Sequence, residues 1–283
     1  MKHCTSRIGF SAAFCIVATF LLLAPSSRAA EWKLVLQDEF DKNGPPDPAN
    51  WDYERGFVRN EELQYYQAEN AVCRNGMLII EAKRERKRNP DYRAERSGWR
   101  NREWIEYTSA CLITRGKHEF TYGKFEMRGR IDIRPGSWPA FWTLGSGRVR
   151  WPECGEIDIM EYYRGTVLAN VCHGLAGRQK WATVKSPVAE LGGDAWAREF
   201  HVWTMEWNEQ NIDLFLDGKL LNHFVVAGDD EPGRDNAFRK PQYILLNQAI
   251  GGTNGGDASK TEFPVRLEVD WVRVYQREQN DRK

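Results

Sequence analysis

The chain has 283 residues, in which 40 Lys and Arg balance 40 Asp and Glu, so its formal net charge at pH 7 is zero. This balance argues against a chain-wide field that would draw the protein to nucleic acid or to an anionic membrane surface, and we expect neither partner. The 12 tryptophans are numerous and indicate a ligand that stacks on flat aromatic rings.

Residues 1–29 have the order of segments that is typical of a secretory signal peptide. Lys2 and Arg7 supply positive charge, residues 8–23 are almost wholly apolar, and small residues lead up to Ala29. The apolar run is shorter than the about 20 residues that a membrane-spanning helix needs. We therefore expect cleavage after Ala29 and a secreted or periplasmic protein without a membrane partner.

Residues 30–283 read as short strands separated by turns that contain Gly, Pro and Asn. Between 125 and 133 apolar side chains alternate with charged ones, which is the period-2 pattern of a strand with one polar face. Asp217-Gly218, between two apolar runs, is typical of a hairpin turn. Further strands are predicted at 77–82, 200–207, 243–250 and 265–275. This pattern predicts an all-β sandwich that forms one domain, since all-β domains of about 200–250 residues often stay single.

Residues 83–102 differ from the rest of the chain in composition. They hold nine Lys and Arg against three acidic residues. Because Pro90 and Gly98 interrupt the segment, we predict a long loop. Its charge suits a clamp for an anionic, for instance sulfated, polysaccharide. The alternative is a solvated loop whose charges have little effect.

Four cysteines follow the predicted signal peptide, and they are Cys73, Cys111, Cys154 and Cys172. In an exported chain they can form disulfides in three different pairings, or they can remain buried thiols, and the sequence leaves both alternatives open. They do not indicate zinc, because no CxxC pair or His/Cys cluster has the spacing of a zinc site.

Three acidic residues, Glu156, Asp158 and Glu161, lie within six positions of one another. If the segment is a strand, Glu156 and Asp158 share one face, but strict alternation turns Glu161 to the opposite face. One extra residue near 159–160, a β-bulge, returns Glu161 to the face of the other two, and bulges beside active sites re-aim side chains in this way.

A shared face of carboxylates suits the cleavage of a glycosidic bond. One carboxylic acid protonates the leaving oxygen, while a second carboxylate attacks the sugar or activates water. Repulsion among neighbouring carboxylates raises at least one pKa, so that one group keeps its proton near neutral pH. The alternatives are a solvated acidic strand face and a calcium site, since hard cations bind several carboxylates.

The segment Gly-Glu-Ile-Asp-Ile-Met-Glu at 155–161 resembles the active-site signature of glycoside hydrolase family 16. That family includes laminarinases, lichenases, agarases, porphyranases and carrageenases. Further segments resemble other parts of the family in the same order, and they lie at 62–66 with Asn70, 107–110, 122–128, 138–142 and 269–275. The resemblance extends from about residue 34 to residue 275.

The resemblance implies a β-jelly roll of the concanavalin A-like class, with an open cleft and a retaining mechanism. It implies that Glu156 is the nucleophile, that Glu161 is the acid and later the base, and that Asp158 holds and tunes Glu156. A retaining pair needs its carboxyl groups about 5–5.5 Å apart. No cofactor is implied for catalysis.

The resemblance implies a polysaccharide partner, first of all a β-1,3-glucan of the laminarin type that a monomeric endo-hydrolase cleaves. The sequences at 136–138 and 247–252 differ from those of many laminarinases, and the basic segment 83–102 is an added feature. A sulfated or anhydro-galactan, such as agarose, porphyran or carrageenan, is therefore an alternative substrate. A transglycosylase and a non-catalytic carbohydrate-binding sandwich are further alternatives, and the intact acids argue against the last.

Several other side chains are candidates for contact with a sugar or an ion. Trp138 and Trp142 are four positions apart, which gives them one face in an extended segment. With Trp151 they can stack on sugar rings, and core packing is the alternative. The remaining candidates for substrate binding are Glu62, His173 and Gln248. Glu39, Gly76 and Asp270 match places where family members hold a structural calcium ion.

Overall fold

The structure of the chain is a computed structural model that describes Met1 and residues 31–175 and 178–278. The predicted signal peptide, apart from Met1, lies outside the described residues, as do Cys4 and Cys15. Within the described part of the chain, no helix is long and apolar enough to cross a bilayer.

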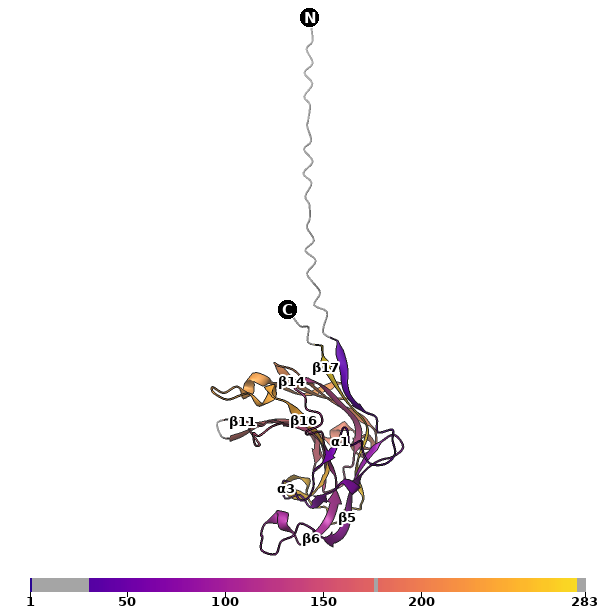
Figure 1. The fold of residues 1–283 in the computed structure, drawn as a ribbon. Coiled ribbons are helices and arrows are strands. Elements are labelled where there is room, and N and C mark those ends of the chain that lie inside the picture. Colours follow the sequence, from indigo (N-terminus) through magenta and orange to yellow (C-terminus); the bar gives the residue numbers. More distant parts are fainter. Residues whose placement is uncertain (2–30, 176–177, 279–283) are drawn as a thin grey trace.

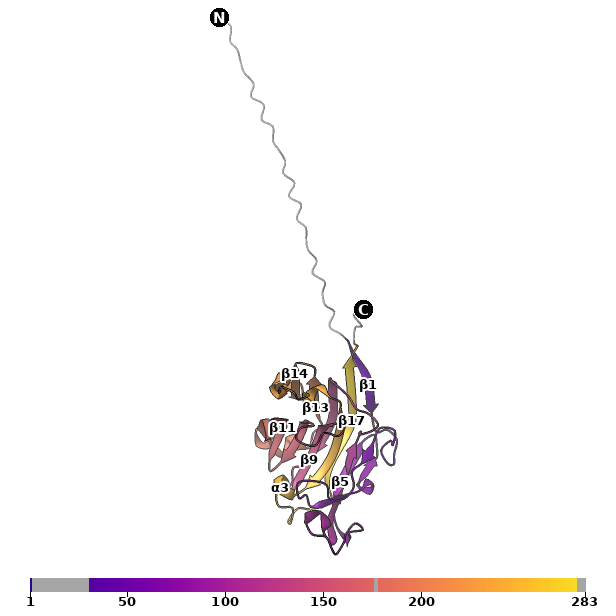
Figure 2. The ribbon, with the colours of Figure 1, turned by 60° about the vertical axis from the view of Figure 1, so that its left-hand side comes forward.

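Two curved, mostly antiparallel β-sheets stack face to face (Figure 1). The larger sheet has the order β15-β14-β13-β8-β17-β5-β6-β3, with β1 beside β17 and β4 beside β5. Its strands are β1 (Trp32–Asp38), β3 (Gln64–Tyr66), β4 (Ala71–Cys73), β5 (Leu78–Arg88), β6 (Trp104–Ser109), β8 (Gly123–Ile131), β13 (His201–Trp207), β14 (Asn211–Leu216), β15 (Lys219–Val225) and β17 (Val265–Arg277). Strands β1 and β17 run side by side at one end of the molecule (Figure 2).

The second sheet, here called the cleft sheet, has the order β12-β11-β10-β9-β16-β7-β2. Its strands are β2 (Asp52–Tyr53), β7 (Cys111–Ile113), β9 (Ser137–Gly145), β10 (Glu156–Tyr163), β11 (Thr166–Leu175), β12 (Arg178–Pro187) and β16 (Gln242–Ile250). The described helices are short: α1 (Val188–Leu191), α2 (Gly193–Ala197), α3 (Gly252–Gly255), η1 (Ala68–Asn70), η2 (Trp99–Asn101), η3 (Val226–Asp229) and η4 (Ala237–Arg239).

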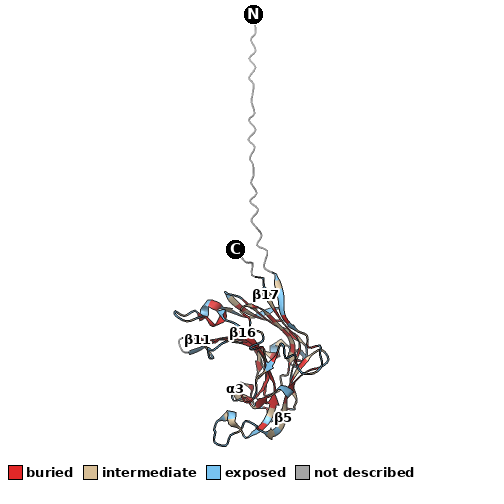
Figure 3. Cartoon of the chain, in the orientation of Figure 1, coloured by how far each residue is buried: buried red, intermediate tan, exposed pale blue. Residues whose placement is uncertain are grey.

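The main hydrophobic core lies between the two sheets, where Figure 3 shows buried residues on the facing sides of the layers. Along β8 every second residue is buried, so Phe125 and Met127 point into the core while the charged residues between them do not. Phe141 and Ile157 enter the same core from the cleft sheet. Full burial of an apolar side chain of this size contributes about 1.5–3 kcal/mol to folding.

The predicted all-β sandwich is confirmed, and each predicted strand is present with slightly different ends. The predicted hairpin is formed by β14 and β15, which pair on either side of Asp217 and Gly218. Both turn residues have positive φ, 49° for Asp217 and 77° for Gly218, as a two-residue hairpin turn of the right twist requires.

The prediction of a loop over the whole of 83–102 is wrong for its first part, because β5 continues to Arg88 and pairs with β6. Opposite charges on the two strands make this charged extension favourable. Arg86 lies 3.4 Å from Glu106, and Arg88 lies 2.5 Å from Glu103. Cross-strand ion pairs of this kind stabilise a sheet.

The cysteines take the thiol alternative. Cys73, Cys111, Cys154 and Cys172 are all described, and each is a buried free thiol. Cys73, Cys111 and Cys172 lie on strands β4, β7 and β11, and Cys154 lies in the turn before β10.

Candidate active site

The acidic segment forms β10, in the middle of the cleft sheet, and a β-bulge interrupts it where the sequence predicted one. The register of β10 against both of its neighbours shifts between Asp158 and Glu161. Ile159 and Met160 are both fully buried in the core, so two successive side chains point inward. Glu161 therefore returns to the face that carries Glu156 and Asp158, and all three line one cleft.

The register of the cleft sheet sets other side chains in a row with these acids. Asp158 lies opposite Trp142 on β9 and opposite Asn170 on β11, and Asn170 lies opposite Thr183 on β12. The row beside it joins Glu156 through β11 to Trp181 on β12. The floor of the cleft is thus built from cross-strand rows, whose spacing the sheet fixes.

The cleft has a volume of about 600 Å³ and runs across the sheet from β12 to the loop before β3. Its aromatic side chains lie on both sides of the acids. The lining residues are Arg59, Asn60, Glu62, Trp138, Ala140, Trp142, Leu144, Trp151, Glu156, Asp158, Glu161, Tyr163, Leu168, Asn170, Trp181, Thr183, Lys185, Asn247 and Asn254.

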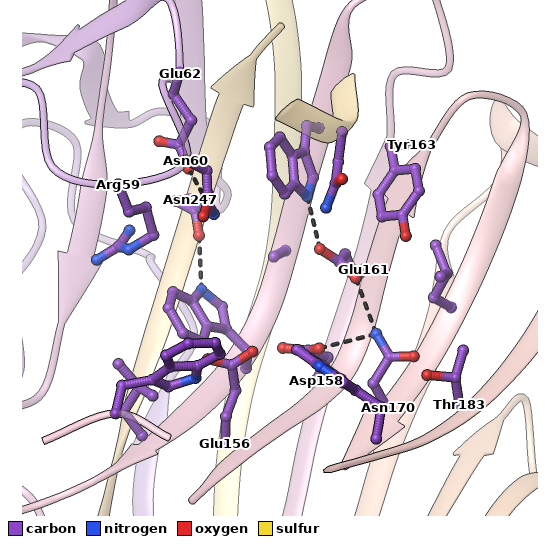
Figure 4. A pocket seen from close by; sticks show the side chains of 18 of the residues that line it. Arg59, Asn60, Glu62, Glu156, Asp158, Glu161, Tyr163, Asn170, Thr183 and Asn247 are labelled. Carbon is purple, nitrogen blue, oxygen red and sulfur yellow. Dashed lines mark hydrogen bonds between the residues drawn. The ribbon is translucent and has the colours of Figure 1, made fainter. Parts of the chain in front are cut away.

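Hydrogen bonds orient the acidic side chains (Figure 4). Asn170 Nδ2 donates to Asp158 Oδ2 and to Glu161 Oε2, both at 2.9 Å. Trp138 Nε1 donates to the other oxygen of Glu161 at 2.8 Å. One amide therefore links the middle acid to Glu161, and an indole fixes the plane of the Glu161 carboxyl group.

Burial raises the pKa of all three acids above the ordinary values. For Glu161 burial and then the charge of Asp158 raise the pKa to about 8, and burial raises the pKa of Asp158 to about 7. Burial, followed by the charges of Asp158 and Glu161, raises the pKa of Glu156, while Arg59 and a hydrogen bond from Trp151 lower it. Because all three pKa values are raised, the group holds at least one proton near neutral pH.

The edge of the cleft beyond Trp142 carries an arginine and a further carboxyl group. Arg59 lies over the Trp142 ring, with its guanidinium carbon 5.0 Å from the ring centre, and pairs with Glu54 at 2.5 Å. Glu62 accepts a hydrogen bond from Gln64 at 2.6 Å. Burial raises the pKa of Glu62 to about 7, so this side chain can both donate and accept hydrogen bonds near neutral pH.

Comparison with known proteins decides the family. The model of the family described as glycosyl hydrolases family 16 matches residues 61–273. The chain belongs to glycosyl hydrolase family 16. A β-glucanase of Rhodothermus marinus is 37% identical to it over 296 aligned residues, which cover 97% of this chain and 96% of that protein.

Solved structures agree with this membership. The laminarinase from Rhodothermus marinus superposes with a TM-score of 0.71 at 38% identity, covering 89% of this chain and 100% of that one. A structure described with endo-acting O-glycanases, which human gut microbiota express to initiate mucin breakdown, has a TM-score of 0.81 at 29% identity. That match covers 90% of this chain and 93% of the other. The family 16 chain is thus a glycoside hydrolase with the jelly-roll fold, and the retaining mechanism is characteristic of its family.

Most of the substrate-binding candidates lie in the cleft of this family 16 enzyme. Trp138 and Trp142 share the cleft face of β9, and Glu62 lies at the cleft edge. Trp151 also lines the cleft and is 47% exposed, so its ring is open to a ligand.

Two predicted positions are wrong, and strand alternation explains both. His173 faces the core, because Asn170 and Leu168 on the same strand take the cleft face. Its Nδ1 lies 2.6 Å from Asp229 Oδ1, and its exposed fraction is only 4%. Phe224 and Phe238 pack against its ring.

Gln248 is fully buried and donates to Ser137 Oγ at 3.1 Å. Its neighbour Asn247 holds the cleft position instead and accepts a hydrogen bond from Trp142 Nε1 at 2.7 Å.

Sequence reasoning missed several lining residues, above all Asn170, Asn247, Arg59 and Trp181. Asn247 is next to Gln248, and Asn170 lies three positions before His173. The alternation of side chains along β16 and β11 is the signal that identifies both asparagines. The sequence of β12 shows no clear alternation of apolar and polar residues, so it does not predict the strand that places Trp181 in the cleft.

The residues proposed for calcium have arginine partners. Glu39 receives two hydrogen bonds from Arg273, at 2.8 and 2.9 Å, and Asp270 pairs with Arg128 at 2.5 Å. Gly76 occupies a turn with φ of 71°. Among the described residues, no three His, Cys, Asp or Glu side chains gather as metal ligands do. The carbonyl oxygen of Gly76 lies outside that count of side chains, so a calcium ion at Glu39, Gly76 and Asp270 stays a prediction.

Proposed function

We propose that this glycoside hydrolase is an exported endo-β-1,3-glucanase that acts as a monomer on laminarin-like polysaccharides. The similarity to the β-glucanase and the laminarinase of Rhodothermus marinus supports the substrate. The order of charged, apolar and small residues in 1–29 supports export. A cleft that is lined by tryptophans and runs across the sheet suits internal positions of a long chain.

The single observation that carries the catalytic proposal is the bulged strand that brings Glu156, Asp158 and Glu161 to one face. In the proposed reaction Glu161 donates its proton to the glycosidic oxygen while a Glu156 oxygen attacks the anomeric carbon. The bond to the leaving sugar breaks, and a glycosyl ester forms on Glu156. Glu161 then removes a proton from water, which displaces Glu156 from the anomeric carbon.

The roles of the three acids are assigned from their order in the family signature. Glu161 has a pKa raised to about 8, which suits a group that must hold a proton at neutral pH. Burial and the charges of Asp158 and Glu161 also raise the pKa of Glu156, and Arg59 and Trp151 oppose that rise. Asp158 shares the Asn170 amide with Glu161, and its charge tunes both neighbours.

A second substrate class has one specific observation in its favour. The structure described with mucin-degrading endo-acting O-glycanases gives the higher TM-score, 0.81 against 0.71 for the laminarinase. An endo-hydrolase of mucin O-glycans is therefore the second candidate.

The test is release of reducing ends from laminarin, lichenan, agarose, porphyran, carrageenan and mucin glycans. We expect laminarin to be cleaved fastest and to yield oligosaccharides before glucose. Glu156→Gln and Glu161→Gln should each lower laminarin turnover by at least about 10²-fold, since each removes a group that acts in the transition state. Wild-type turnover by Glu156→Gln would refute the catalytic proposal, and faster cleavage of a galactan would replace the proposed substrate.

A further inference from the structure

Two loops form the edge of the cleft beyond Trp142, and they touch each other. The first, residues 54–63, carries Arg59, Asn60 and Glu62 into the cleft, and the second, residues 251–261, carries Asn254. The Thr253 amide donates to the Asn60 carbonyl at 2.9 Å. A Cβ on Gly252 would meet that carbonyl oxygen at 2.6 Å, so the two loops are in close backbone contact.

Two arginines of the basic segment bind the first loop from outside the cleft. Arg100 Nε and Nη2 donate to the carbonyl of Val58, at 3.1 and 2.6 Å. Arg102 Nη2 donates to the carbonyl of Glu61 at 3.0 Å, and its Nη1 donates to that of Leu63 at 3.3 Å. These three carbonyls flank the residues that line the cleft.

Aromatic rings hold the two guanidinium groups in place. The Arg102 guanidinium carbon lies 4.7 Å from the ring centre of Phe57, and that of Arg100 lies 4.5 Å from Trp99. Cations over aromatic rings are attracted by the ring quadrupole, and Phe57 belongs to the first loop, so this contact adds to the hydrogen bonds of Arg102 with that loop.

A third arginine binds the second loop in the same manner. Arg84 Nη2 donates to the carbonyls of Ala258 and Ser259, each at 2.7 Å. Its guanidinium carbon lies 5.5 Å from the Tyr107 ring and 5.1 Å from the Phe263 ring. Arginine suits this task because its planar group can donate to two carbonyls at once.

The first loop needs such support because of its backbone. Asn60 and Glu61 have φ of 53° and 52°, in the left-handed region that residues with side chains rarely adopt. A conformation of this kind persists only when the surroundings fix it. The carbonyl of Glu61 is one of the acceptors of Arg102.

Four other cations of the basic segment are paired with acids. Lys83 lies 3.3 Å from Glu81, and Lys87 lies 3.2 Å from Glu85. Arg86 pairs with Glu106 on β6, and Arg88 pairs with Glu103 just before β6. Arg93 instead donates to the carbonyls of Pro90 and Tyr92.

We propose that Arg84, Arg100 and Arg102 are positioning residues that set the substrate-binding edge of the cleft. They hold the loops 54–63 and 251–261 by their carbonyls, so that Arg59, Asn60 and Glu62 meet the sugar in a fixed arrangement. The basic segment therefore acts on the substrate through these loops. The inference rests on the proposed function in one respect, which is the choice of a glucan as the substrate for its test.

The experiment compares Arg100→Ala/Arg102→Ala, Arg102→Lys and the control Arg86→Ala on laminari-oligosaccharides of increasing length. We expect the double variant to raise KM by about ten-fold with kcat changed less than about two-fold, because the loops bind sugar away from the reacting bond. Its cleavage positions should shift on the longer oligosaccharides. The KM of Arg102→Lys should lie between those of the wild type and the double variant, since an ammonium group does not bridge both carbonyls in one fixed geometry.

Arg86→Ala should match the wild type, because Arg86 belongs to the same segment but pairs with Glu106. Unchanged KM and cleavage positions in the folded double variant would overturn the proposal. An equal rise in KM for Arg86→Ala would show that the effect does not depend on the loop contacts, and it would overturn the proposal as well. If the double variant does not fold, Arg102→Lys carries the same test. Inactivity of the wild type on every glucan is a failure of the proposed function, and the comparison is then made on the polysaccharide that the panel identifies.

Discussion

The two sides of the cleft are held in place by different means. On the catalytic side, Glu156, Asp158 and Glu161 project from a central strand, and backbone hydrogen bonds on both flanks fix their spacing. On the opposite edge, the cleft residues of 54–63 sit on a loop that distant arginines hold by side-chain bonds. In the proposed function, the reacting groups thus sit on a strand that is paired on both sides, whereas part of the sugar-binding edge sits on loops held by side chains.

The largest expected effect separates the catalytic acids from everything else in the cleft. Glu156→Ala should abolish detectable glucan cleavage, and external azide should restore turnover with a glycosyl azide of α configuration, because azide enters the vacated face. Glu161→Ala with azide should yield the β product, because the nucleophile is intact. Product stereochemistry by NMR is the measurement. Identical configurations from the two variants would contradict the assigned roles.

The next effect sharpens the contrast by disturbing the rigid side without removing an acid. Asn170→Ala deletes one donor that lowers the pKa of both Asp158 and Glu161. Both pKa values should rise, so the fall of kcat/KM at high pH, where Glu161 loses its proton, should move to higher pH. We expect kcat to drop by about 10–100-fold, as for other removed orienting groups. An unchanged pH profile would show that Asn170 does not couple the acids.

A smaller effect is expected for the aromatic ring at the β12 end of the cleft. Trp181 is 45% exposed and lies across the acids from Trp142, so it can stack on a sugar of the leaving group. Trp181→Ala should raise KM for long oligosaccharides several-fold, because stacking of this kind contributes about 0.5–1.5 kcal/mol. An aryl glycoside with no sugar on that side is the control, and its KM should stay unchanged. Equal loss on both substrates would contradict a leaving-group site.

The smallest expected effect is on the free energy of unfolding, which depends on pH because the Glu161 carboxyl group is buried. Burial raises the pKa of Glu161 from 4.5 to about 8, so the folded state binds its proton more tightly than the unfolded chain does. The contribution of this group to stability is complete below about pH 4.5 and is lost as pH rises through about 8.

Glu161→Gln removes this dependence. Its Tm should therefore exceed that of the wild type by a few degrees at pH 8 and by less at pH 5, as calorimetry can measure. A Tm difference that is the same at both pH values would contradict the raised pKa.

Local pattern was enough to predict the catalytic side of the molecule. The alternation of apolar and polar residues predicted the strands, and the one extra residue between Asp158 and Glu161 predicted the bulge. Both patterns are properties of consecutive residues. The family resemblance added the roles. His173 and Gln248 were wrong because choosing a face requires the phase of the alternation, which Asn170 and Asn247 reveal only once the strand is placed.

The opposite edge could not be predicted in the same way. The hydrogen bonds of Arg84, Arg100 and Arg102 to the two loops join residues that are 39 to 175 positions apart in the chain. Composition showed an excess of positive charge in 83–102, but it could not show that carbonyl oxygens would accept its hydrogen bonds. Such pairings depend on how loops cross in space, and no periodicity records them.

The paired burial of Ile159 and Met160 also determines which kinds of genetic change the motif can survive. A swap of either side chain for another apolar one alters only packing volume. Loss or gain of a single codon between Asp158 and Glu161 would put that glutamate on the hydrophobic side of the layer and rotate Tyr162 and Tyr163 with it. This segment should therefore tolerate amino-acid substitutions during evolution but not insertions or deletions.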